Sequence, residues 1–371
     1  MFTNTISQNK VNEDKNRIRI LSPSLPKINR VKKYFKNIDQ NRIYSNFGPL
    51  VTKFESRLAD YFGVTTNLIS TCANATLALE GSIRTSNVES NATWELPSWT
   101  FSATPTAALN ASIKIKFVDC DLKSMRAIFS PDIKHVIDVL PFGASINFDQ
   151  YFKKDLIIID AAASFDALKN IGSVLLNKTP TIIILSFHAT KILGLGEGGC
   201  VISNDENWIK RFRCWSNFGF DNERQSILLG NNAKMSEYHA AVGLATLDKW
   251  SFIKKKWQKQ LERALKISKS EGIIVSESMQ EGFISPYWFV DTRSEKFKHQ
   301  LQSALYLNNI EFRNWWGSGC HQMKAFENIE QDELPNTESL SKTTISLPFH
   351  LNLQKNDFHR IHTVIQQARN I

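Results

Sequence analysis

The sequence predicts an α/β fold in which helices flank a mainly parallel mixed sheet. Short apolar runs alternate with segments whose apolar residues recur at helical spacing, as in strands linked by crossover helices. At 371 residues, the chain is long enough for two domains. Because the composition shifts near residue 250 to a Lys- and Gln-rich helix, we expect a large domain at 1–250, with an N-terminal arm at 1–26, and a smaller α+β domain at 251–371.

Composition narrows the classes of function. The net charge of +9 would suit nucleic acid, anionic lipid or a phosphorylated ligand. There is no zinc-finger, RNP-like or basic-zipper pattern, so we expect no nucleic-acid partner. No apolar stretch reaches the roughly 20 residues of a membrane span, and no signal peptide is apparent. Five scattered cysteines without a Cys-x-x-Cys pair indicate reduced thiols, no metal site and a cytoplasmic location.

The elements follow one another in a regular order. Helical spacing predicts helices at 27–40 and 50–62, a third that opens at Asn74 and a small-residue helix that ends near residue 110. A further long helix follows Ser236, which could cap it. Strands are expected at 67–71, 94–96, 113–118, 135–140, 156–159, 182–185 and 200–202.

Lys191 stands out because it follows a predicted strand and precedes a Gly-rich turn. A lysine amine that is partly desolvated can lose its proton and attack carbonyl groups. The alternative is an ordinary exposed loop lysine. Gly194, Gly196 and Gly199 match G-x-G-x-x-G, but the next residues suggest a strand. The dinucleotide motif needs a helix there, so we reject it.

Asp160 ends the apolar run at 156–159. Ligands of open α/β sheets bind at the carboxyl ends of the strands, which makes an aspartate there a candidate contact. A helix N-cap is the equally common alternative.

Five motifs in this order, spanning about residues 40 to 350, resemble the DegT/DnrJ/EryC1/StrS family of nucleotide-sugar aminotransferases. These are fold-type I enzymes that depend on pyridoxal 5′-phosphate (PLP), and the resemblance implies that fold. The motifs are Asn74-Ala-Thr-x-Ala-Leu79, Pro97-Ser-Trp-Thr-Phe101, Asp160-Ala-Ala162, Ser186-Phe-His-Ala-Thr-Lys191 with Gly196-Glu-Gly-Gly199, and Gly230-x-Asn-x-Lys-Met-Ser-Glu237; the resemblance ends with Ser346-Leu-Pro-Phe-His350.

The resemblance implies a role for each matching residue. Lys191 corresponds to the lysine that forms a Schiff base with PLP and then moves a proton, and Asp160 to the acid that pairs with the pyridine nitrogen. Phe101 corresponds to the aromatic that stacks on the ring, with Trp99 as a rival. The expected phosphate contacts are Ala75, Thr76 and Ser186, together with Asn232 from the neighbouring subunit. The resemblance therefore implies a homodimer with shared active sites.

The chain departs from the family pattern at a few positions. Ala163 stands where many members have Gln near the phenolic oxygen of the cofactor, so another group or a water must serve there. Lys234 replaces a common Arg and loses its planar fork. Asn-Ala-Thr replaces the commoner Ser-Gly-Thr in the phosphate turn. Family dehydratases carry His in place of the Schiff-base lysine, whereas this chain keeps Lys191. We interpret His188 and His321 as structural.

The function implied by the resemblance is transfer of an amino group from L-glutamate to a nucleotide-linked keto-6-deoxyhexose. The expected acceptor is a dTDP- or UDP-4-keto sugar of the dTDP-4-keto-6-deoxyglucose type, aminated at C-4. Its product would feed bacterial surface polysaccharide such as lipopolysaccharide O-antigen. Amination at C-3 of a 3-keto sugar is the alternative within the class. A non-catalytic regulator on the same fold is the rival, and retention of Lys191 and Asp160 argues against it.

Overall fold

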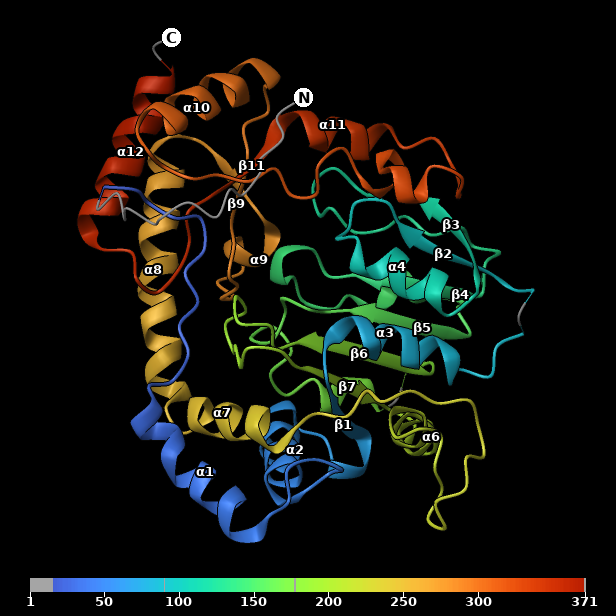
Figure 1. The fold of residues 1–371 in the computed structure, drawn as a ribbon. Coiled ribbons are helices and arrows are strands. Elements are labelled where there is room, and N and C mark those ends of the chain that lie inside the picture. The colour runs from blue at the N-terminus through green and yellow to red at the C-terminus, as the bar shows by residue number, and fades with distance from the viewer. Residues whose placement is uncertain (1–15, 90, 177, 370–371) are drawn as a thin grey trace.

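A mixed eight-stranded sheet forms the centre of the larger part of the molecule (Figure 1). The computed structural model describes residues 16–89, 91–176 and 178–369. The strand order is β1-β7-β6-β5-β4-β2-β3-β10; β7 runs antiparallel to β1 and β6, and the other neighbours are parallel. The strands are β1 (Ile69–Cys72), β2 (Thr93–Pro97), β3 (Lys114–Val118), β4 (His135–Val139), β5 (Leu156–Asp160), β6 (Thr181–Ser186), β7 (Gly199–Ser203) and β10 (Glu330–Gln331).

Helices cover both faces of this sheet, which explains why its central strands β5 and β6 are continuous apolar runs. Side chains alternate between the faces, so Ile157 and Ile159 join one hydrophobic core and Ile158 joins the other. One face packs against α3 (Ala75–Arg84), α4 (Ala103–Asn110) and α6 (Glu206–Ser216), and the other against α1 (Ile28–Asn41), α2 (Pro49–Phe62) and α7 (Glu237–Leu247). The short α5 (Gly172–Leu175) precedes β6.

The C-terminal part begins with the long helix α8 (Trp250–Ser270) and holds a second sheet (Figure 1). This antiparallel sheet has the order β11-β9-β8, with β8 (Ile274–Val275), β9 (Trp288–Asp291) and β11 (Thr344–Leu347). The accompanying helices are α9 (Glu277–Gln280), α10 (Glu295–Leu307), α11 (Pro335–Thr343) and α12 (Lys355–Arg369). β10 also comes from this part but pairs with β3 in the large sheet. The domain boundary after residue 250 stays a prediction.

The predicted α/β class with a mainly parallel sheet is confirmed. Residues 67 and 68, which were expected to be strand, instead belong to a 3₁₀ turn at Thr66–Leu68. The turn forms because the Leu68 N–H donates to the Thr65 carbonyl at 3.0 Å. Ser236 caps α7, as expected, by accepting from the His239 N–H. None of the helices in the described ranges is long and apolar enough to cross a membrane.

The described end of the predicted N-terminal arm packs against the C-terminal part. Ile18 and Ile20 are buried, and the Ile18 N–H donates to the Asn309 carbonyl at 2.9 Å. The Ile20 N–H donates to the Glu311 carboxylate at 2.8 Å. Residues 1–15 of the arm lie outside the described residues.

Asp138 is a buried carboxylate at the penultimate position of β4. One of its oxygens, Oδ2, accepts hydrogen bonds from the Tyr151 hydroxyl and the Gln150 amide, both at 2.5 Å. No hydrogen-bond partner for Oδ1 is found among the described residues. Burial raises the pKa of this carboxyl to about 6, from an ordinary 3.8, despite these bonds and the nearby Arg126.

We predict that Asp138→Asn is at least as stable as the wild type at pH 8. Because burial raises the pKa of Asp138 from 3.8 to about 6, the ionised form costs roughly 3 kcal/mol in the folded state. Between pH 4 and pH 6 the folded protein keeps a proton that the unfolded chain releases, so this group favours folding less as pH rises. The advantage of Asn should therefore shrink towards pH 4 in thermal melts. An equal loss of stability at every pH would contradict this account.

Candidate active site

Lys191 lies in the turn between β6 and β7. Backbone hydrogen bonds close this turn, since Lys191 N–H donates to the His188 carbonyl and Ala189 N–H to the Gly196 carbonyl, both at 2.8 Å. Gly196 has a φ of +107°, and a Cβ on Gly194 would lie 2.6 Å from the Ala189 oxygen, so these two positions require glycine. Gly199 then begins β7, which confirms that the glycines do not open a helix.

The amine of Lys191 contacts an aromatic residue from the C-terminal part. Its Nζ donates to the Tyr287 hydroxyl at 3.0 Å and lies 5.3 Å from the centroid of that ring. Sequence reasoning did not identify Tyr287. The two residues are far apart in the chain, and no motif spacing connects them.

Asp160 is the last residue of β5, the strand beside β6. Its carboxylate accepts from the Thr104 hydroxyl of α4 at 2.8 Å and from the Ala162 N–H at 3.1 Å. Burial raises the pKa of the carboxyl, while these hydrogen bonds and the charge of Lys191 act in the opposite direction. It does not cap a helix, so a buried carboxylate at the strand end is available to a cationic ligand group.

The start of α3 lies beside the ends of β6 and β7. Asn74 caps the helix by accepting from the Leu77 N–H at 2.9 Å, and Ala75 and Thr76 form the partly exposed first turn. A Cβ on Gly199 would lie 2.8 Å from the Ala75 nitrogen, so glycine is needed for this close approach. Ser186 pairs with Gly199 across the two strands, which brings its hydroxyl to the same corner.

The two candidate stacking rings differ in exposure. Phe101, just before α4, is 54% exposed, whereas Trp99 is 1% exposed and packs edge-on against Trp316. Only Phe101 therefore presents a ring face to a ligand.

Asn232 is exposed on the loop before α7, and its side-chain oxygen accepts from Lys234 Nζ at 2.8 Å. The next residue, Ala233, is buried, and its carbonyl accepts from the Ala73 N–H at 2.7 Å. The loop thus runs beside the start of α3 with the Asn232 side chain directed outward. Lys234 also lies 4.4 Å from the Phe218 ring centroid, and burial lowers the pKa of its amine.

The two histidines that were interpreted as structural differ in their surroundings. His188 is exposed, with its Nδ1 2.8 Å from the Thr190 hydroxyl. His321 is buried, and its Nδ1 lies 2.7 Å from the Ser98 hydroxyl. Burial lowers the pKa of the His321 imidazole. Within the described residues, neither forms a hydrogen bond or ion pair with Lys191 or Asp160, and the structural interpretation stays a prediction.

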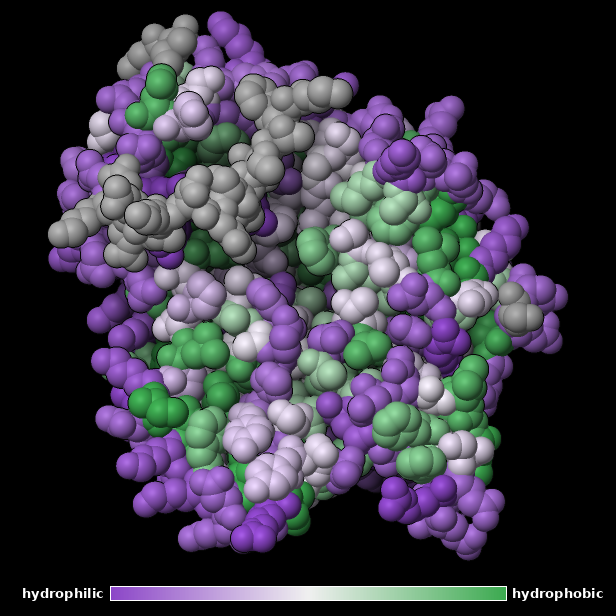
Figure 2. Space-filling view, viewed as in Figure 1, coloured by the Kyte–Doolittle hydropathy of each residue, from purple (hydrophilic) through white to green (hydrophobic). Residues whose placement is uncertain are grey.

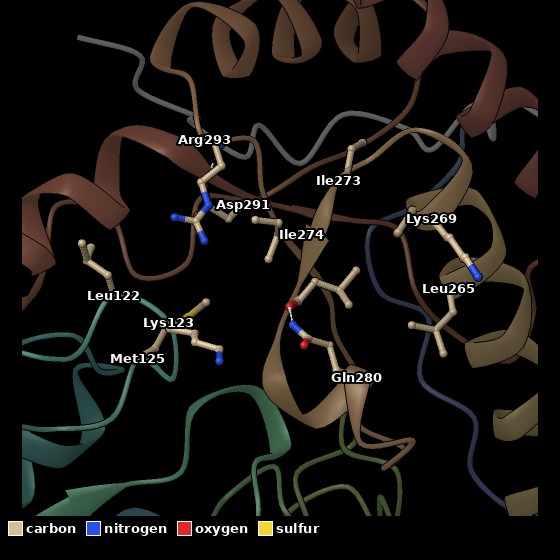
Figure 3. Close-up of a pocket in the computed structure, with 12 residues that line it drawn as sticks. Leu122, Lys123, Met125, Leu265, Lys269, Ile273, Ile274, Gln280, Asp291 and Arg293 are labelled. Carbon is tan, nitrogen blue, oxygen red and sulfur yellow. Dashed lines mark hydrogen bonds and ion pairs between the residues drawn. The ribbon is translucent and has the colours of Figure 1, made fainter.

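A cavity of about 420 Å³ lies elsewhere, between the loop before β4 and the α8–β8 region (Figure 3). Lys123, Lys269 and Arg293 line it, but Arg293 is already paired with Asp291 at 3.0 Å. The cavity contains neither Lys191 nor Asp160. Across the described part of the chain, no cluster of three or more His, Cys, Asp or Glu could hold a metal ion.

The side chains at the ends of β5 and β6 fit a planar aromatic aldehyde that carries a phosphate. The partly exposed first turn of α3 and the Ser186 hydroxyl suit the phosphate, because a helix N-terminus favours anions. Phe101 offers an exposed face, and the buried Asp160 suits a ring N–H cation. Lys191 supplies the amine for an aldehyde.

Comparison with known proteins points the same way. The DegT/DnrJ/EryC1/StrS aminotransferase family model matches residues 27–366. A dTDP-4-amino-4,6-dideoxy-D-glucose transaminase of Shigella dysenteriae is 26% identical over 370 residues, covering 95% of this chain and 99% of the relative. A UDP-2-acetamido-2-deoxy-3-oxo-D-glucuronate aminotransferase of Pseudomonas aeruginosa is 30% identical over 214 residues, covering 54% of this chain and 58% of the relative.

A solved structure from Bacillus cereus, assigned as a PLP-dependent aminotransferase, superposes with a TM-score of 0.86. It is 29% identical and covers 95% of this chain and 100% of the other. The family model spans most of the sequence and includes the strand ends that carry Asp160 and Lys191. The chain therefore belongs to the DegT/DnrJ/EryC1/StrS aminotransferase family.

Proposed function

We propose that this chain is a PLP-dependent aminotransferase that moves an amino group from L-glutamate to C-4 of a dTDP-4-keto-6-deoxyhexose. One observation carries the proposal: a lysine amine and a buried carboxylate lie at the ends of adjacent strands, beside a helix start and an exposed aromatic ring. The free thiols of its cysteines support a reducing, cytoplasmic location.

Each residue has a definite task in this proposal. Bound PLP would supply the electron sink that makes a C–H bond next to nitrogen breakable. Asp160 holds the ring-nitrogen proton, because a buried carboxylate is stabilised by a neighbouring cation. The first turn of α3 and Ser186 bind the phosphate, and Phe101 orients the ring. Lys191 holds the cofactor and, once free, carries a proton on Nζ.

The choice of acceptor rests on the relatives. The Shigella dysenteriae relative, which aligns along nearly its whole length, is named for a 4-amino dTDP sugar and supports C-4. The Pseudomonas aeruginosa relative is named for a 3-oxo substrate and supports the alternative of C-3 amination, but it aligns with about half of this chain. The amino-sugar product would enter a bacterial surface polysaccharide such as O-antigen. A non-catalytic regulator remains the rival, against which the fit of Lys191 and Asp160 to PLP argues.

We also propose a homodimer in which Asn232 reaches the phosphate of the partner's cofactor. Exposed apolar side chains surround its loop, including Leu229, which is 88% exposed, Ile227 and Phe218. Tyr44 and Tyr238, which lies in the first turn of α7, are also exposed, and their ring centroids are 6.2 Å apart. Figure 2 shows hydrophobic side chains among polar ones over the lower half of this face, around α7. Such a surface suits burial against a second copy, since monomers seldom expose contiguous apolar patches.

The proposed reaction predicts a yellow protein that consumes L-glutamate with a 4-keto sugar nucleotide. We expect turnover with dTDP-4-keto-6-deoxyglucose to exceed turnover with UDP-linked and 3-keto sugars, measured as amino-sugar product by mass spectrometry. Lys191→Ala should lose both the visible absorbance and turnover, because it removes the amine. Faster turnover of a 3-keto sugar would favour the alternative, and full activity of the alanine variant would contradict the role of Lys191.

Asp160→Asn should fold but lose activity by about 100-fold or more, because the amide cannot supply the charge that holds the ring proton. Asp138→Asn is the matched control: it is also a buried aspartate, on the adjacent strand β4. Its register partner is Ile159, so it faces the opposite side of the sheet from Asp160 and should keep its activity. Steady-state rates of both variants test this. Wild-type rates in Asp160→Asn would remove it from the site.

A mixture of two defective variants tests the shared site. In a mixed dimer of Lys191→Ala and Asn232→Ala, both substitutions would fall in one site and the other site would be intact. Activity should therefore return to about half per mixed dimer after subunit exchange. Proven exchange without recovery would mean that Asn232 serves its own subunit or that the site is not shared.

A further inference from the structure

Tyr287 is the one side chain of the C-terminal part with a direct hydrogen bond to Lys191 among the described residues. It directly precedes β9, the central strand of the small sheet, which pairs with β8 on one side and β11 on the other. The next two residues, Trp288 and Phe289, are fully buried. The backbone that carries Tyr287 is thus held by two strand partners and by the core.

The segment before Tyr287 packs against two loops of the large sheet, in a contact among Ser285, Gly143 and Ala163. Gly143 follows β4 and has a φ of +97°. A Cβ at this position would lie 2.5 Å from the Ser285 Cβ and 3.2 Å from the Ala163 carbonyl oxygen. Residues that follow β4 and β5 therefore meet the segment two positions before Tyr287. Ala163 has only a methyl group, so its side chain offers the amine no hydrogen bond.

The Tyr287 ring is held between two other aromatic rings. It packs edge-on against Phe142 at 5.6 Å and against Trp315 at 5.7 Å between ring centroids. Phe142 is itself stacked on Phe289 at 3.7 Å and on Trp316 at 4.6 Å. These contacts limit sideways movement of the ring, so the hydroxyl stays directed at the lysine amine.

We propose that Tyr287 is a positioning residue for Lys191. Its hydroxyl oxygen accepts a hydrogen bond from Nζ. This bond holds the amine beyond the end of β6, at the edge of the sheet where β5 ends with Asp160. Among the described residues, the amine acts on Asp160 through its charge and on Tyr287 through a hydrogen bond, so one partner comes from each part of the chain. The inference deepens the proposed function and rests on it, because the amine is held in place for the cofactor aldehyde. It also makes the site dependent on the placement of the C-terminal part.

The variant Tyr287→Phe distinguishes a role of the Tyr287 hydroxyl from a role of its ring in packing. If only the ring matters, Tyr287→Phe keeps the contacts with Phe142 and Trp315 and changes nothing at Lys191. If the hydroxyl positions the amine, the same variant keeps its melting temperature but binds PLP less well. Tyr287→Phe also lacks the hydroxyl oxygen that accepts from the Lys191 nitrogen and so favours its protonated form. The pH at which the bound cofactor changes colour should therefore be lower in this variant.

The experiment compares wild type, Tyr287→Phe and the matched control Tyr306→Phe, which alters an exposed tyrosine on α10. Each protein is freed of cofactor and titrated with PLP, and its visible absorbance is then followed against pH. We expect PLP to bind about three- to tenfold more weakly to Tyr287→Phe, as for loss of one hydrogen bond, with a lower pH midpoint. Tyr306→Phe should match the wild type.

Unchanged PLP affinity and an unchanged pH midpoint in Tyr287→Phe would overturn the proposal, as would a lower melting temperature with normal PLP binding. These readouts involve no sugar. A protein that binds PLP but aminates none of the sugars refutes the proposed function and leaves the result for Tyr287 standing. A wild type that does not bind PLP overturns both.

Discussion

The site depends on the placement of two opposite charges at the ends of adjacent parallel strands. β5 and β6 run side by side, so their carboxyl ends reach the same edge of the sheet, where Asp160 and Lys191 lie. Burial makes the ionised carboxylate costly, as its raised pKa shows, and a cation beside it offsets part of that cost. The continuous apolar runs of these strands, covered on both faces, bury Asp160, whereas Lys191 in the turn beyond β6 is half-buried.

Two glycines, Gly199 after the lysine turn and Gly143 after β4, show how close backbone approaches bring the parts of the site together. Gly199 lets β7 approach the start of α3 closely enough to bring Ser186 beside Ala75. Gly143 does the same for the contact between the large sheet and Ser285. In each case a side chain would occupy space that a neighbouring backbone or side chain already fills. The site is therefore built by close approaches between loops as much as by its polar side chains.

The strands, the helices that flank them and the positions of Asp160 and Lys191 could be predicted because they depend on local periodicity and on chain order. The 3₁₀ turn at Thr66–Leu68 could not, because a single backbone hydrogen bond decides it. Exposure separated Phe101 from Trp99, which the sequence left as rivals. Tyr287 was missed because its contact with Lys191 arises from the packing of the C-terminal part, which carries no local signal.

The central claim is that the amine of Lys191 is the point at which this chain attaches its cofactor. The direct test is to incubate the purified protein with PLP, reduce it with borohydride, digest it and locate the added mass by mass spectrometry. The account predicts a phosphopyridoxyl group on the peptide that contains Lys191, at that residue. A modification found instead on another lysine, or none at all under conditions in which the protein is folded, would contradict it.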